Sequence, residues 1–161
     1  MDTTLEQRVG ELLRNRQLKL GAAESCTGGL ISHRITNVPG SSDYFLGAIV
    51  SYSNSAKEYM LSVPTAILMA YGAVSELTAR HMARGAKGVF QADITLALTG
   101  IAGPGGGTAD KPVGLTYIAL LTPTGEWCER HVWAGDRLAV KEQSAEAALD
   151  LLRRYLEGEL T

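Results

Sequence analysis

Three side chains that could act as nucleophiles stand next to one another in the stretch 23–29, Ala-Glu-Ser-Cys-Thr-Gly-Gly. They are the hydroxyl of Ser25, the thiol of Cys26 and the hydroxyl of Thr27. A helical pattern begins directly after the two glycines, and the first turn of a helix offers free N–H groups and favours negative charge. Glycine also lets a ligand approach the backbone closely. The stretch therefore predicts a nucleophile beside a turn that can hold an anion.

A candidate general base follows in the stretch 52–57, Tyr-Ser-Asn-Ser-Ala-Lys. A lysine accepts a proton only if its pKa falls well below the free value of roughly 10.4, and burial or a neighbouring cation has that effect. Tyr52 could relay a proton or orient the Lys57 amine. Ser25, Lys57 and Tyr52 would then form a hydrolase site that needs no histidine. The alternative is a capped helix with a solvated lysine, which is the usual state of this residue.

A third stretch, 100–107, reads Gly-Ile-Ala-Gly-Pro-Gly-Gly-Gly. Successive N–H groups of such a loop can form a nest for phosphate or another anion. The loop is not a P-loop, because it lacks the Gly-Lys-Ser/Thr ending, and a long turn remains the alternative. Near the start of the last predicted helix, Asp136 is a candidate N-cap, and Arg137 either reaches a phosphate or is solvated.

Two neighbours of Ser25 have a structural explanation. Glu24 precedes the serine, and the alternation of a strand turns its side chain away from that of Ser25, so we expect it to bond neighbouring backbone. Cys26 has no evident histidine partner to activate its thiol, so we expect a small buried side chain.

The composition argues against several classes of protein. The chain has 161 residues, which favours a single domain over 1–161 with a core of its own. Its net charge is −2 and it has no basic stretch, which argues against nucleic acids and anionic membranes as partners. No apolar run approaches the roughly 20 residues that cross a bilayer, and residues 1–6 lack the features of a signal peptide. We therefore expect a cytoplasmic protein.

Cysteine and histidine usage predicts no metal site. Cys26 and Cys128 lie far apart in the sequence and form no CxxC pair. His33, His81 and His131 lack the spacing of metal ligands. The simplest interpretation of the two unpaired cysteines is that the protein works in a reducing compartment.

Strands and helices are predicted to alternate over the first hundred residues, followed by a hairpin and a last helix whose apolar residues recur at helical spacing. This order predicts an α/β fold with a mixed sheet between two helical layers. The predicted strands are 18–23, 44–52, 93–99, 113–122 and 126–134. The predicted core face of the last helix is Leu138, Ala145, Ala148, Leu149, Leu152 and Leu156. Ligands of such sheets bind beyond the carboxyl ends of strands, so the three stretches could converge at one edge.

Taken together, the motifs resemble the CinA C-terminal domain family. The resemblance runs over nearly the whole chain in the same order, and six spaced motifs make it specific. The motifs are Ala23-Glu24-Ser25-Cys26-Thr27-Gly28-Gly29, Gly40-Ser41-Ser42, Val50-Ser51-Tyr52-Ser53-Asn54 with Lys57, Gly72-Ala73-Val74-Ser75, Thr99-Gly100-Ile101-Ala102-Gly103-Pro104 and Lys111-Pro112-Val113-Gly114. The resemblance implies a three-layer α/β/α sandwich with a mixed central sheet that forms a homo-oligomer.

Stand-alone members of this family are nicotinamide-nucleotide amidohydrolases, which convert nicotinamide mononucleotide (NMN) and water to nicotinic acid mononucleotide and ammonia. The resemblance implies this reaction of pyridine nucleotide recycling, without a metal or an organic cofactor. It implies a Ser/Lys/Tyr site, whose positions fall on Ser25, Lys57 and Tyr52. The expected substrate-binding residues are Thr27, Gly28, Gly29, Thr99, Gly100, Ala102, Gly103, Gly105, Gly106 and Arg137.

One departure from the family concerns the phosphate group of the substrate. The family has a further arginine just inside the last helix, where this chain has Leu138-Ala139-Val140, so the basic residue that holds the phosphate stays open. Two alternative functions also stay open. The first is a nucleotide- or phosphate-binding module without turnover, and the second is a hydrolase of the same design that acts on another amide.

Overall fold

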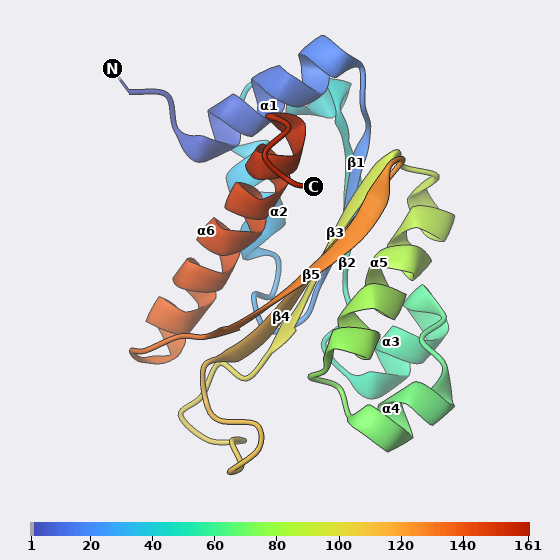
Figure 1. The fold of residues 1–161 in the computed structure, drawn as a ribbon, viewed down its shortest axis with the longest axis vertical. Helices are drawn as coiled ribbons and strands as arrows, with labels where there is room; N and C mark the ends of the chain where they lie inside the picture. Colours follow the sequence, from blue (N-terminus) through green and yellow to red (C-terminus); the bar gives the residue numbers. More distant parts are fainter. Residues whose placement is uncertain (1) are drawn as a thin grey trace.

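The computed structural model describes residues 2–161 and contains a five-stranded sheet between two layers of helices (Figure 1). The strands are β1 (Leu20–Glu24), β2 (Phe45–Val50), β3 (Ile94–Gly100), β4 (Leu115–Thr122) and β5 (Gly125–Val132). Their order across the sheet is β2-β1-β3-β4-β5. β1 is parallel to β2 and β3, β4 is antiparallel to β3, and β5 is antiparallel to β4.

The helices cover both faces of this sheet. They are α1 (Leu5–Arg16), α2 (Leu30–Thr36), α3 (Asn54–Leu61), α4 (Thr65–Tyr71), α5 (Glu76–Phe90) and α6 (Arg137–Leu156), with a 3₁₀ turn η1 (Ser41–Asp43). α1, α2 and α6 lie on one face, and α3, α4 and α5 lie on the other (Figure 1). None of the helices that residues 2–161 form has both the length and the apolar character needed to cross a bilayer.

β1 is the central parallel strand, and its small side chains let both helical layers approach it. All five of its residues are buried, as expected for a strand with neighbours on both sides. Leu20 packs in the core under α1, α2 and α6, and Ala23 packs in the core under α5. Alternation along the strand therefore turns Glu24 toward α2 and Ser25 toward α5.

A close contact fixes α3 on α5. Gly85 of α5 lies against the last residue of α3, so that a Cβ atom on Gly85 would stand 1.9 Å from the Leu61 carbonyl oxygen. The backbones of the two helices touch at this point, which only a glycine allows. The contact therefore also fixes the position of Lys57, an expected site residue on α3.

The expected α/β/α architecture with a mixed sheet is confirmed, with local corrections. β2 ends at Val50, so Tyr52 lies in the following loop and not on the strand. Leu138 is 66% exposed, and its expected place in the core is wrong. Asp136 caps α6, whose buried face begins only at Val140, so Leu138 in the first turn stays outside the core.

Candidate active site

The carboxyl ends of three parallel strands lie at one edge of the sheet, where β3 runs two residues beyond the ends of β1 and β2. Glu24, the last residue of β1, pairs with Val50 of β2 and with Leu98 of β3. The pairing continues beyond the strand, because Ser25 N–H donates to the Leu98 carbonyl at 3.0 Å and Ser51 N–H donates to the Glu24 carbonyl at 2.9 Å. The loops after these strands therefore leave from one edge. Helices on opposite faces follow β1 and β2, and this is the kind of edge where α/β sheets bind ligands.

Ser25 and Lys57 meet at this edge in a buried contact. The Nζ atom of Lys57 lies 3.0 Å from the Oγ atom of Ser25. Lys57 is only 1% exposed and Ser25 is 7% exposed. The amine also donates to the carbonyl of Ser51 at 2.7 Å. When Lys57 is neutral, this second bond uses one N–H and leaves the lone pair free for the proton of Ser25.

Burial lowers the pKa of Lys57 from its ordinary value of 10.5, against a smaller opposite effect of Cys26. Burial disfavours the charged form of an amine, and no carboxylate within residues 2–161 forms an ion pair with this lysine. Ser53 caps α3 by accepting from the N–H of Ala56 at 3.0 Å, which places Lys57 one turn into the helix. The helix thus inserts a lysine with a lowered pKa beside a serine hydroxyl.

Glu24 organises the turn that carries Ser25. Its fully buried carboxylate accepts from the Thr27 hydroxyl at 2.8 Å, and from the N–H groups of Ile31 and Ser32 at 2.9 and 3.0 Å. It takes the place of an N-cap for α2, because Gly29 has no side chain to serve as one. The expected structural role of Glu24 is confirmed. The expectation of free N–H groups in this helix turn is wrong for Ile31 and Ser32, since a carboxylate already binds them.

Cys26 is buried beside Ser25 as an inert thiol. Its side chain is 6% exposed, and burial raises its pKa to about 11. A thiol with a raised pKa is a poor nucleophile, because the thiolate is the reactive form. The chemistry of the stretch therefore concentrates on Ser25.

Tyr52 and Arg137 form a bridge over the site. Arg137 donates from Nη2 to the Tyr52 hydroxyl at 2.8 Å and from Nη1 to the Gly103 carbonyl at 2.7 Å. The tyrosine is 61% exposed, and its hydroxyl bonds Arg137, with no hydrogen bond to Lys57 in the described chain. The bridge joins the loop after β2, the glycine loop after β3 and the first residue of α6, although these segments are far apart in sequence.

A small cavity of ≈150 Å³ lies in front of Ser25. Several of the expected site residues line it together with Cys26 and two residues, Ala73 and Val74, to which the sequence alone gave no role. The full lining is Ser25, Cys26, Tyr52, Lys57, Ala73, Val74, Thr99, Gly100, Ala102 and Arg137. Small-molecule pockets typically measure about 300 Å³ or more, so this cavity is too small to enclose a whole ligand of that size.

Other expected binding residues lie outside this lining. Thr27 is 1% exposed and its hydroxyl bonds Glu24. Gly28 donates its N–H to the carbonyl of Ser25 at 3.0 Å. Gly29 precedes α2, while Gly105 and Gly106 are exposed in the loop after β3, which projects beyond the sheet at the end where α6 begins (Figure 1). The cavity-lining residues form the interior of the site, whereas Thr27 and these four glycines lie around it.

Lys141 is a basic residue near the site that the sequence did not single out. Its Nζ atom lies 3.9 Å from the place of a Cβ atom on Gly28. Residues four apart on a helix share one face, so the spacing from Arg137 was the available signal. Most arginines of the protein pair with carboxylates, whereas neither Arg137 nor Lys141 forms such a pair within residues 2–161. Two unneutralised cations thus stand near the serine turn.

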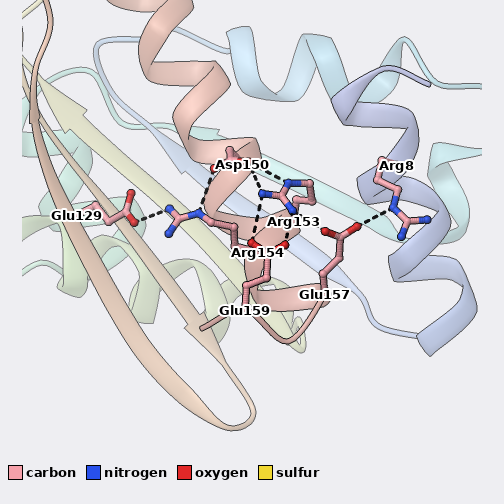
Figure 2. Close-up of polar contacts among 7 residues, drawn as sticks. All are labelled: Arg8, Glu129, Asp150, Arg153, Arg154, Glu157 and Glu159. Carbon is pink, nitrogen blue, oxygen red and sulfur yellow. Dashed lines mark hydrogen bonds and ion pairs between the residues drawn. The ribbon is translucent and has the colours of Figure 1, made fainter. Parts of the chain in front are cut away.

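A larger hollow of ≈820 Å³ lies elsewhere, between α2, α6 and β5. Its lining includes Arg34, Glu129, Trp133, Glu146 and Arg154. Figure 2 shows part of its wall, where the guanidinium of Arg154 joins Glu129 of β5 to Asp150 of α6. The lining holds no serine, cysteine or lysine, whereas Ser25, Lys57 and several other expected site residues line the smaller cavity, so the smaller cavity is the candidate active site. No group of three or more His, Cys, Asp or Glu side chains in residues 2–161 is placed to hold a metal ion.

Comparison with known proteins places the chain among homologues over nearly its whole length. The family model described as CinA C-terminal domain matches residues 2–156. A CinA-like protein of Desulfotalea psychrophila is 51% identical over 153 residues, which make up 95% of this chain and 37% of that protein. The chain thus spans less than two fifths of the length of this relative.

Solved structures extend the comparison to three dimensions. The competence/damage inducible protein CihA of Agrobacterium tumefaciens superposes with a TM-score of 0.91 at 39% identity, covering 95% of this chain and 93% of that one. A CinA superfamily protein of Klebsiella pneumoniae superposes with a TM-score of 0.92 at 31% identity, covering 96% of each chain. Both similarities extend over the whole sandwich.

Proposed function

This chain belongs to the CinA C-terminal domain family, and from that premise we propose that it is a nicotinamide-nucleotide amidohydrolase, converting NMN and water to nicotinic acid mononucleotide and ammonia. The observation that carries the proposal is the buried contact of 3.0 Å between Lys57 and Ser25. Nucleophilic amide hydrolysis requires a nucleophile and a base within hydrogen-bond reach. A serine beside a lysine of lowered pKa meets that requirement without a histidine or a metal.

The first half of the proposed reaction acylates Ser25. Neutral Lys57 takes the hydroxyl proton while Ser25 Oγ bonds to the carboxamide carbon. The tetrahedral intermediate then breaks its C–N bond, and the nitrogen leaves as ammonia with the proton that Lys57 holds. The bond from Lys57 to the Ser51 carbonyl keeps the amine in place during both transfers.

The second half returns the enzyme to its starting state. A water molecule occupies the place that ammonia vacated. Lys57 takes a proton from this water while the water oxygen bonds to the acyl carbon. The C–Oγ bond then breaks and the proton returns to Ser25. The products are the free carboxylic acid and the unmodified serine.

Backbone N–H groups at the serine turn are the candidate donors to the oxyanion. The N–H of Gly28 is already bonded to the Ser25 carbonyl, whereas those of Cys26 and Thr27 have no acceptor within residues 2–161. We assign the oxyanion to these two free groups. One such donor contributes about a hundredfold or more to the rate in serine hydrolases.

Arg137 and Lys141 are the proposed ligands of the substrate phosphate. Only the pyridine carboxamide fits a cavity of ≈150 Å³, so ribose and phosphate extend outward past the glycine loop. Arg137 contacts the glycine loop at Gly103, and Lys141 lies near Gly28 of the serine turn. Neither cation has a carboxylate partner in the described chain. In this proposal the phosphate replaces the neutral acceptors that now hold Arg137, since charge-assisted hydrogen bonds are stronger.

An ammonia-release assay with NMN tests the proposed function. We expect turnover by the wild type and loss of at least about a thousandfold in Lys57→Met, because the base is removed. Lys87→Met is the matched control, since Lys87 of α5 donates to the Ala92 carbonyl in the loop after that helix and does not line the cavity. Binding of NMN with no ammonia release would instead favour a binding module, and turnover of other amides but not NMN would favour a different substrate.

A further inference from the structure

Thr99 stands beside Ser25 on the neighbouring strand. Glu24 of β1 and Leu98 of β3 are in register, so Ser25 and Thr99 are the next pair along these parallel strands. Neighbouring strands lie about 4.8 Å apart. Both side chains point to the α5 face, and both residues line the same cavity. Thr99 is therefore next to the carbon that Ser25 attacks in the proposed reaction.

The hydroxyl of Thr99 already donates its proton in a hydrogen bond within the protein. Its Oγ1 donates to the carbonyl of Ala73 at 2.7 Å, and the residue is 1% exposed. A hydroxyl has one proton and two lone pairs. With the proton bound to Ala73, the oxygen can only accept hydrogen bonds from a ligand in the cavity.

We propose that Thr99 selects the amide by accepting one N–H of the substrate carboxamide. This assignment rests on the proposed amidohydrolase function. The –NH₂ group of the amide donates a hydrogen bond to the Thr99 hydroxyl oxygen. The carboxylate of the product has no proton to donate, so its oxygen and the Thr99 oxygen repel each other. Sites built around a required hydrogen bond discriminate strongly, because the mismatched ligand leaves a buried polar group unpaired.

The same acceptor serves both halves of the reaction. In the first half the N–H···Oγ1 bond fixes the carboxamide so that its carbonyl oxygen faces the serine turn. After ammonia leaves, the incoming water donates to Thr99 with one hydrogen and to Lys57 with the other. Hydrolysis then creates the carboxylate that Thr99 repels, which favours release of the product.

The test compares Thr99→Val and Thr99→Ser with a matched control on the same strand. Thr95→Val removes an equivalent bond, because the Thr95 hydroxyl donates to the Ala83 carbonyl of α5 at 2.7 Å, and Thr95 does not line the cavity. The readouts are KM and kcat for ammonia release from NMN, and the affinities of NMN and nicotinic acid mononucleotide by calorimetry with Ser25→Ala added to each protein, so that NMN is not consumed. Thermal unfolding of each variant measures its stability, so that a loss of folding is not mistaken for a loss of binding.

We expect Thr99→Val to reduce the preference for the amide over the acid by about tenfold, which is the value of one hydrogen bond. Thr99→Ser should restore it, and Thr95→Val should leave it unchanged. The assignment is overturned if Thr99→Val weakens the binding of the amide and of the acid equally, so that the ratio of the two affinities equals that of the wild type. Turnover of NMN by the wild type would still support the proposed function. Absence of ammonia release from the wild type overturns the proposed function, and the calorimetric ratio still decides whether Thr99 selects amides. Failure to bind either nucleotide overturns both.

Discussion

The amine of Lys57 lies 3.0 Å from the hydroxyl of Ser25 and 2.7 Å from the carbonyl of Ser51, and all three groups are inside the protein. A lysine at such a position is costly to charge. The fold accepts it because α3 enters next to the end of β1, with the backbone contact between Leu61 and Gly85 holding the helix in place. If Lys57 is the base that we propose, catalysis and stability are coupled through this one side chain.

The lowered pKa of Lys57 predicts that its protonation reduces both the stability of the fold and the activity. Between the lowered pKa and 10.5 the unfolded chain binds more protons than the folded one, so the stability of the wild type rises with pH in that window. Lys57→Met lacks this contribution. We expect the difference in free energy of unfolding, wild type minus Lys57→Met, to rise with pH across the window in denaturant titrations.

The activity should follow the same group. Below its lowered pKa Lys57 is protonated, so kcat/KM for NMN should rise with pH and level off below pH 10.5. A stability difference that stays flat with pH, or a rate that falls as pH rises through this range, would show that Lys57 keeps an ordinary pKa.

Glu24 should be required for the stability of the serine turn. Its carboxylate accepts four hydrogen bonds in the interior, from Thr27, Ile31 and both donors of Ser32. Removing the acceptor leaves buried donors unpaired, at about 1–3 kcal/mol for each group. We expect Glu24→Ala to lower the free energy of unfolding by at least about 2 kcal/mol in urea titrations. Glu58→Ala on α3, whose side chain forms no ion pair within residues 2–161, is the control, and an equal effect of both changes would contradict the capping role.

Arg137 and Lys141 should govern the recognition of phosphate and leave the chemistry of the amide unchanged. Hydrogen bonds to charged groups contribute about 1.5–3 kcal/mol, so Arg137→Ala or Lys141→Ala should raise KM for NMN by about tenfold or more. The loss should be absent with free nicotinamide, which has no phosphate. Arg16→Ala, at the exposed end of α1, is the matched control. An equal loss with both substrates would mean that the two cations act on the reacting group.

The two glycines of α5 should respond in opposite ways to alanine. A Cβ atom at Gly85 meets the Leu61 backbone at 1.9 Å, whereas a Cβ atom at Gly88 has nothing within 4 Å. Gly85→Ala should cost about 2 kcal/mol by overpacking and reduce activity, since it displaces the helix of Lys57. Gly88→Ala should stabilise by about 0.5–1 kcal/mol. Thermal unfolding compares them, and similar Tm values would contradict the close packing of α3 on α5.

Local signals in the sequence were enough to predict the architecture. The apolar spacing of Ala145, Ala148, Leu149, Leu152 and Leu156 predicted the buried face of α6, and all five are buried. Leu138 fits the same spacing yet lies in the solvent, because periodicity does not say where a helix leaves the sheet. Tyr52 was assigned to a strand for a similar reason, since its apolar ring suits a strand that in fact ends two residues earlier.

The site was harder to predict, because its contacts join distant segments. The sequence singled out Ser25 and Lys57, but their spacing of 32 residues says nothing about a distance of 3.0 Å. Lys141 escaped notice because only the fold brings it toward Gly28. The bond from Thr99 to the Ala73 carbonyl depends on how α4 meets α5, and no residue pattern encodes that junction.

The measurement that tests the central claim most directly is ammonia release from NMN by Ser25→Ala beside Cys26→Ala, each shown to be folded by thermal unfolding. The account predicts that Ser25→Ala loses at least about a thousandfold of the activity, while Cys26→Ala stays within a few-fold of the wild type because its thiol is inert. Near-normal ammonia release by folded Ser25→Ala, or loss in Cys26→Ala alone, would contradict the account.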